Sequence, residues 1–159
     1  MFSTFSPKQL FVLCGFASAS LLIAAFGFEY IGELAPCKLC LWQRWPHAGI
    51  ITFSILGATG GLRAGLAFLL IVLFAAITAA IAGYHVGVEQ QFWPGPSSCS
   101  GTVAAISTAD MLDRLLATPV VKCDEIAWSF AGVSMAGWNM LLSAGLAGFA
   151  LLARRNGAK

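Results

Sequence analysis

Four long apolar segments constrain the fold of this chain more than any other feature of its sequence. Each approaches the roughly 20 residues that a helix needs to cross the hydrocarbon core of a bilayer. Inside lipid such a segment is helical, since an open strand would leave its backbone amides unpaired. We therefore predict an all-α membrane protein, a single domain over residues 1–159 built as a four-helix transmembrane bundle, with spans at about 9–28, 46–61, 65–84 and 135–153.

The composition agrees with a membrane protein and argues against binding to nucleic acid. Of the 159 residues, 58% are hydrophobic and only 10% are charged, whereas an average globular chain carries about 25% charged residues. The formal net charge of +2 is too small to attract a polyanion. Small residues are frequent in all four apolar segments, which favours close packing of helices in lipid.

The distribution of charge predicts how the chain lies in the membrane. Basic residues near the ends of spans stay in the cytoplasm, and all seven acidic residues fall in the first and third connections between spans. We expect both termini to be cytoplasmic, the first segment to be a retained anchor, and two extracytoplasmic loops at about 29–45 and 85–134. The basic residues that support this orientation are Lys8, Arg63, Arg154, Arg155 and Lys159.

The second outer loop has a short amphipathic segment of its own. Between residues 108 and 118, Met111, Leu112, Leu115 and Leu116 recur on one helical face. This pattern predicts a short helix that lies either in the membrane interface or on the tops of the spans.

Four of the five cysteines fall in the two predicted outer loops, namely Cys37, Cys40, Cys99 and Cys123. Disulfides persist in oxidising compartments outside the cytoplasm. The fifth, Cys14, lies in the first span, where a buried thiol usually acts as a small apolar side chain. The loop cysteines therefore belong to an exported face of the protein, where they can form two pairs.

Three uses of these cysteines stay open at this point. Two cysteines separated by two residues can close a small disulfide that exchanges readily with other thiols, as in a redox centre. A non-enzymatic four-span protein would instead use both pairs to staple its loops, although so small a loop restricts an unfolded chain only weakly. A zinc site would need free thiolates and closer spacing in the second pair, and we expect no metal.

The residues after the first pair add charge and aromatic surface. Arg44 follows Cys40 by four residues, and its positive charge would stabilise a thiolate. Pro46 disfavours helical geometry at Trp45 and is favoured at a first helical position. We expect a turn or short helical piece from Cys37 to Trp45 and a regular helix that begins near Pro46.

Two kinds of side chain near the predicted outer surface are further candidates for a site. Trp42 is typical of an interfacial aromatic belt, and its ring could also form one wall of a site for a flat aromatic ligand. His47 and His85 lie where a proton relay would act, although ordinary interfacial histidines occur there as well.

The order of these features resembles the bacterial disulfide-bond formation protein B family, DsbB. The likeness rests on four spans, the motif Pro36-Cys37-x-x-Cys40-x-x-x-Arg44 before the second span, and a later pair, Cys99 and Cys123. It covers essentially the whole chain. The resemblance implies an oxidase of the bacterial inner membrane with its cysteine loops in the periplasm. Such an enzyme re-oxidises the soluble thiol oxidase DsbA and passes two electrons to a membrane quinone, ubiquinone or menaquinone.

The resemblance also implies a role for each cysteine. A DsbA cysteine would attack the Cys99–Cys123 disulfide at Cys99, and Cys123 would then attack Cys37. Cys40 would remain as the thiolate that faces the quinone. Arg44 would stabilise that charge and, with Trp42 and His47 as further candidates, hold the quinone. A vitamin K epoxide reductase-like enzyme is the alternative, although that family usually carries its Cys-x-x-Cys motif in a late span.

Overall fold

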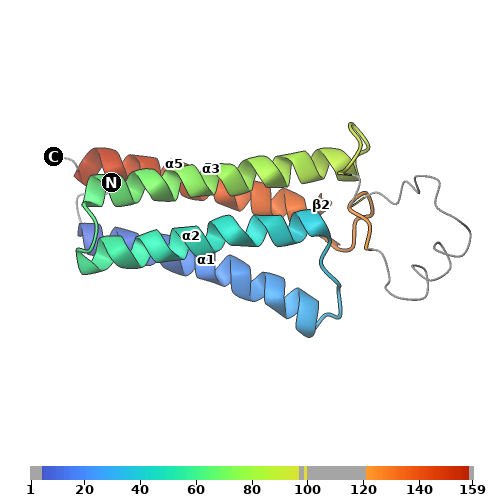
Figure 1. Ribbon diagram of the computed structural model, residues 1–159, viewed down its shortest axis with the longest axis horizontal. Helices are drawn as coiled ribbons and strands as arrows, with labels where there is room; N and C mark the ends of the chain where they lie inside the picture. Colours follow the sequence, from blue (N-terminus) through green and yellow to red (C-terminus); the bar gives the residue numbers. More distant parts are fainter. Residues whose placement is uncertain (1–4, 97–98, 100–120, 158–159) are drawn as a thin grey trace, which may run out of the picture.

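The computed structural model describes residues 5–96, 99 and 121–157, and this part of the chain is mainly helical. Its four helices are α1 (Pro7–Tyr30), α2 (Lys38–Thr59), α3 (Ala64–Glu89) and α5 (Met135–Gly157). Figure 1 shows them side by side, with both chain ends at one end of the bundle and the start of α2 at the other. The prediction of a mainly helical protein with four long helices is confirmed, while the sidedness of its ends stays a prediction.

Three of these helices are long and apolar enough to cross a membrane. They are α1, α3 and the Met135–Arg155 part of α5. The helix α2 is less apolar than these three helices and is not among the candidate spans. Its first turns carry charged and polar side chains such as Lys38, Gln43 and Arg44. A transmembrane position for α2 therefore stays a prediction.

The helix α2 begins at Lys38 and continues through Pro46, so the prediction of a regular helix that starts near Pro46, after a turn or short helical piece, is wrong. Cys37 caps the helix, and its sulfur accepts a hydrogen bond from the Cys40 amide at 3.2 Å. An acceptor at this position satisfies one of the free amides of the first turn, which lets the helix start at the dithiol. Pro46 lies inside α2, and helices packed in a membrane bundle tolerate an interior proline better than isolated helices do.

The helix α3 also extends further than predicted. It ends at Glu89 rather than near Tyr84, so His85 and Glu89 lie on a helix instead of in the outer loop. Because these two residues are four apart, their side chains share one helical face. The predicted short helix over 108–118 lies outside the described residues.

A small antiparallel hairpin, which the sequence analysis did not predict, precedes α5. It consists of β1 (Ser129–Phe130) and β2 (Val133–Ser134). Its two-residue turn, Ala131 and Gly132, has φ values of 52° and 78°, as a hairpin turn with two positive φ angles requires. The hairpin leads directly into the first turn of α5.

Close packing of helices marks the end of the bundle near the chain termini. Phe11 of α1 stacks on Phe68 of α3 with ring centroids 4.1 Å apart, and each is only 1% exposed. Gly57 of α2 lies against Phe11, so a Cβ added there would stand 2.7 Å from the ring. Contact between α1 and α2 at this level therefore depends on the absence of a side chain.

Substitution of Gly57 by alanine is expected to destabilise the protein by about 1–3 kcal/mol, the usual cost of overpacking. The Phe11 ring cannot yield easily, because Phe68 holds its other face. Thermal unfolding of the purified protein in detergent, followed by circular dichroism, measures the effect. The control is Gly145→Ala on α5, where an added Cβ meets nothing within 4 Å. An equal loss of stability in both variants would contradict the packing argument.

Candidate redox site

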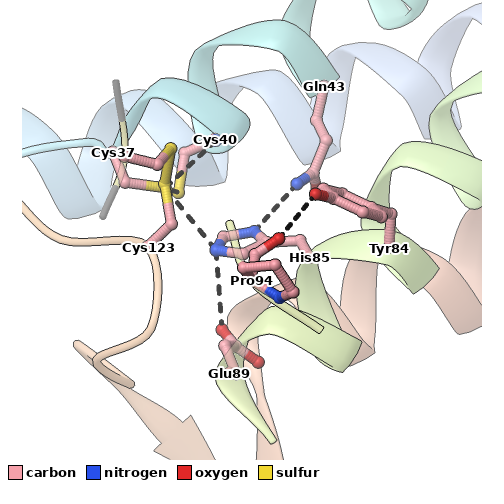
Figure 2. The surroundings of a disulfide bond; sticks show 9 residues. Cys37, Cys40, Gln43, Tyr84, His85, Glu89, Pro94 and Cys123 are labelled. Carbon is pink, nitrogen blue, oxygen red and sulfur yellow. Dashed lines mark hydrogen bonds and ion pairs between the residues drawn. A yellow bond between two sulfur atoms is a disulfide. The ribbon is translucent and has the colours of Figure 1, made fainter. Parts of the chain in front are cut away.

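The four predicted loop cysteines come together at the end of the bundle opposite the chain termini. Cys99 and Cys123 form a disulfide, whereas Cys37 and Cys40 have free sulfurs 2.7 Å apart. Cys37, Cys99 and Cys123 are buried in one cluster, and Cys40 packs against it. The structure therefore brings two cysteine pairs from distant parts of the chain into one packed group, part of which Figure 2 shows.

The two sulfurs at the start of α2 differ in acidity. The hydrogen bond between them is the largest influence on both, since it raises the pKa of Cys37 and lowers the pKa of Cys40. Burial raises the pKa of each thiol, and the charge of Arg44 lowers that of Cys40 as a smaller effect. Cys40 is therefore the sulfur that loses its proton more readily, with the Cys37 thiol as its hydrogen-bond donor.

His85 lies between the first cysteine pair and an acidic side chain (Figure 2). Its Nε2 is 3.5 Å from the Cys37 sulfur and 3.9 Å from Glu89 Oε1, and its Nδ1 is 3.0 Å from the side-chain nitrogen of Gln43. Ser134 of β2 donates a hydrogen bond to the other Glu89 oxygen. The hairpin thus holds the acidic group that faces His85.

Arg44 lies one helical turn beyond Cys40 and joins α2 to α1. Its Nη1 forms an ion pair with Glu29, its Nη2 donates to the backbone oxygen of Ala25 at 3.4 Å, and its Cζ lies 4.7 Å from the centre of the Phe26 ring. Its buried Nε has no hydrogen-bond partner among the residues that the structure describes. The guanidinium is therefore held against α1 through its two terminal nitrogens.

A cavity of about 430 Å³ lies beside these groups. This volume falls within the roughly 300–1,000 Å³ that small-molecule sites have. Apolar side chains of α1 and α5 form much of its wall. Its polar lining includes Cys40, Gln43, Arg44, His47 and His85. An apolar wall with a few converging polar groups suits a flat, lipid-soluble ligand.

Comparison with known proteins assigns the family. Residues 7–153 match the family model described as Disulfide bond formation protein DsbB. The chain belongs to the DsbB family. The resemblance inferred from the cysteine motifs and the spans is confirmed, and with it a role in disulfide bond formation at a membrane.

Curated relatives extend over nearly the whole length of this DsbB-family chain. Disulfide bond formation protein B of Xanthomonas axonopodis pv. citri is 34% identical over 155 residues, which cover 93% of this chain and 90% of the relative. Disulfide bond formation protein B 2 of Pseudomonas savastanoi pv. phaseolicola is 34% identical, with 88% and 83% covered. Disulfide bond formation protein B of Pasteurella multocida is 30% identical, with 90% and 83% covered.

Two further predicted site residues have different surroundings in this DsbB-family protein. His47 is 3% exposed, lines the cavity, and is held by Ser18 and Asn139. Trp42 is 45% exposed and does not contribute to the cavity wall. A role for Trp42 at a ligand stays a prediction that this cavity does not support.

The geometry at Cys37, Cys40 and His85 argues against zinc, although their ligand atoms lie within 4.8 Å of one another. Two sulfurs on a tetrahedral zinc ion, each about 2.3 Å from it, stand roughly 3.8 Å apart. The separation of 2.7 Å between the Cys37 and Cys40 sulfurs is shorter than this. A site made of all four loop cysteines is wrong, because the sulfurs of the Cys99–Cys123 disulfide are not thiolates.

Four residues of this site were not predicted from the sequence, namely Glu29, Gln43, Glu89 and Asn139. Polar side chains inside apolar helices are costly and usually mark a function or a polar partner. Gln43 and Asn139 carry this signal, and both line the cavity. Their mutual contact was not predictable, since 96 positions separate them in the chain.

Proposed function

We propose that this DsbB-family protein oxidises the dithiol of a soluble, DsbA-like periplasmic protein and passes two electrons to a membrane quinone. The observation that carries the proposal is the packing of both cysteine pairs in one cluster, with the Cys37–Cys40 pair also lining the cavity. Disulfide exchange requires sulfurs that can reach one another. In this proposal the protein spans the bacterial inner membrane, with its termini in the cytoplasm and its cysteine end in the periplasm.

Exchange starts at the Cys99–Cys123 disulfide. A partner thiolate attacks the Cys99 sulfur, the bond to Cys123 breaks, and Cys123 leaves with the electron pair. Cys123 then attacks Cys37 of the oxidised Cys37–Cys40 pair and releases Cys40 as a thiolate. This assignment agrees with the lower pKa of Cys40, because the more acidic thiol is the better leaving group.

The remaining exchanges return the second pair to its starting state. The second partner thiolate attacks the partner sulfur that is bound to Cys99, which frees the oxidised partner and the Cys99 thiolate. Cys99 attacks Cys123, the Cys99–Cys123 bond forms again, and Cys37 leaves as a thiolate. In net terms, the partner dithiol has become a disulfide and the Cys37–Cys40 disulfide has become a dithiol.

The cavity fits a quinone ring by its volume, its apolar wall and the cationic Arg44 side chain in its lining. A bound quinone would supply the electron acceptor, taking two electrons and two protons when the Cys37–Cys40 disulfide forms again. Cys40 and Arg44 both line the cavity, so a thiol and a guanidinium would stand beside the ring, and the apolar walls would exclude water. Ubiquinone and menaquinone both have the flat ring that such a cavity requires.

Two competing functions are disfavoured. A scaffold with stapled loops does not need a free dithiol beside a cavity, as Cys37 and Cys40 are. Membership of the DsbB family favours the thiol oxidase over a vitamin K epoxide reductase-like enzyme.

The direct test mixes the purified protein in detergent with a reduced DsbA-like dithiol protein and a water-soluble ubiquinone analogue. We expect partner thiols to disappear only when quinone is present, with one quinone reduced for every two thiols lost. Thiol titration and quinone absorbance give the two counts. Quinone-independent or absent thiol loss would contradict the proposal and leave the loop-stapling interpretation in place.

Substitution of Arg44 by alanine is expected to raise the apparent KM for quinone on the order of tenfold, because it removes a charge-assisted donor from the cavity. The KM for the partner protein should change little. Steady-state rates with varied quinone measure both values. The matched control is Glu29→Gln, which breaks the same ion pair but leaves the Arg44 Nε in place. An unchanged quinone KM in Arg44→Ala would remove this residue from the site.

A further inference from the structure

A continuous chain of buried polar groups connects the Cys37 sulfur with the middle of the bundle. It runs from Cys37 to His85 at 3.5 Å, from His85 to Gln43 at 3.0 Å, and from Gln43 to Asn139 at 2.6 Å. These residues belong to α2, α3 and α5. Gln43 and His85 are 6% and 4% exposed. In so dry a place each donor must face an acceptor, and this requirement determines where the hydrogens lie.

Thr78 determines the direction of the Asn139 amide. The single hydroxyl hydrogen of Thr78 goes to the backbone oxygen of Gln43 at 3.3 Å, so the Thr78 oxygen accepts from the Asn139 nitrogen at 3.4 Å. On its other side, the Asn139 oxygen accepts from the Ser143 hydroxyl at 3.2 Å and from His47 Nε2 at 3.0 Å. His47 can carry its hydrogen on Nε2 because the Ser18 hydroxyl, 2.9 Å away, can donate to its Nδ1. The Asn139 amino group therefore faces Gln43.

The direction of Asn139 determines that of Gln43, and Gln43 determines the tautomer of His85. Because the Asn139 amino group donates to Gln43 Oε1, the Gln43 amino group faces His85 Nδ1. An amino group offers only hydrogens here, so Nδ1 is the nitrogen without a hydrogen. His85 is thus a neutral ring with its hydrogen on Nε2.

The two polar side chains near Nε2 of His85 in the described part of the chain agree with this tautomer. Its Nε2 faces the Cys37 sulfur from α2 and the Glu89 carboxylate from α3. A hydrogen on Nε2 therefore faces two acceptors, the Cys37 sulfur and the Glu89 carboxylate (Figure 2).

We propose that Gln43 is a positioning residue that decides which sulfur of the Cys37–Cys40 pair carries the negative charge. It holds His85 as a neutral ring, so Cys37 keeps its proton, donates it in a hydrogen bond to Cys40, and leaves Cys40 as the thiolate that faces the cavity. A charged imidazole would instead draw the thiolate to Cys37, because a charge-assisted hydrogen bond is about twice as strong as a neutral one. The use of this asymmetry in electron transfer rests on the proposed function, whereas the tautomer and the site of the charge do not.

The first test observes the tautomer directly. The chain has two histidines, so nitrogen NMR of histidine-labelled protein shows two rings, and His85→Asn identifies the signals of His85 by their loss. We expect a hydrogen on Nε2 and none on Nδ1. In Gln43→Glu, a carboxylate oxygen faces Nδ1, and we expect Nδ1 to gain a hydrogen. A parent protein whose His85 already carries a hydrogen on Nδ1 would overturn the proposal.

The second test identifies the thiolate. The fully reduced protein is treated briefly with iodoacetamide at near-neutral pH, and trypsin then separates Cys37 from Cys40 by cleavage after Lys38. Mass spectrometry should find Cys40 modified faster in the parent. In Gln43→Glu the Cys40-to-Cys37 ratio should fall by about tenfold, since one unit of relative acidity is a factor of ten.

The control for both tests is Ser54→Ala, a buried position on the same helix whose hydroxyl has no partner among the described residues. It should change neither the NMR signals of His85 nor the ratio of modification. A Gln43→Glu protein with a hydrogen on Nδ1 but an unchanged ratio would overturn the assignment of the charge. If that variant does not fold, the unsubstituted protein still tests the proposal. Its His85 should carry a hydrogen on Nε2 and none on Nδ1, and its Cys40 should be modified faster than its Cys37. Neither measurement uses quinone or partner protein, so failure here is distinct from failure of the proposed function.

Discussion

Substitution of Cys40 by alanine is expected to lower quinone-dependent oxidation of the partner dithiol by more than about 1,000-fold, the usual scale for loss of a covalent nucleophile. Cys40 is the more acidic sulfur of its pair and lines the cavity. Without it, Cys37 has no sulfur with which to form a disulfide, so electrons cannot leave the protein in pairs. Initial rates of quinone reduction in the presence of reduced partner measure the loss.

The matched control is Cys14→Ala, the same chemical change at a different cysteine. Cys14 is 0% exposed and packs in the apolar core that contains Phe11 and Phe68. Its rate should stay within roughly twofold of the parent, because a buried thiol of this kind serves as packing. A Cys40→Ala protein that turns over as fast as Cys14→Ala would show that electrons leave by another route.

Substitution of Cys99 by alanine is expected to abolish the covalent complex with a partner protein that retains only its attacking cysteine. With the Cys99–Cys123 bond intact, such a partner has no second thiol to release itself, and the mixed disulfide accumulates. Without Cys99, the attacked sulfur is missing. Electrophoresis under non-reducing conditions detects the complex, and mass spectrometry locates the bond.

The control for this experiment is Cys37→Ala, which leaves the Cys99–Cys123 disulfide in place and should still form the complex. A complex trapped with the Cys99→Ala variant would reassign the first attack to another cysteine, most directly to Cys123. The pair of variants thus separates entry of electrons at the second pair from their exit at the first.

The part of the site that α2 contributes could be predicted from the sequence, because it depends on the spacing of residues along one helix. Cys40, Arg44 and His47 recur at intervals of three and four residues, and on the continuous helix α2 they line one cavity. The start of that helix was not predictable, since the rule for residues before proline favours a break at Trp45. The Cys37 sulfur acts as the cap, and contacts with other helices outweigh the local preference.

The remaining features of the site depend on residues that are distant in the chain. The Glu29 carboxylate that pairs with Arg44 comes from α1, and the Ser134 hydroxyl that binds Glu89 comes from the unpredicted hairpin. Hydrogen-bond partners of this kind are chosen by geometry among several packed elements, and no local pattern contains that information.

The sequence by itself determined that the chain forms long apolar helices, that four cysteines lie in two connections, and that the order of these features is that of the DsbB family. These properties follow from hydropathy and spacing, which act over one or two helical turns. Only the tertiary structure decided that α2 begins at the dithiol, that Arg44 pairs with Glu29 beside a cavity, and that Gln43 faces His85. Those outcomes require α1, α2, α3 and α5 to pack together first, because burial is what forces each polar group to find a single partner.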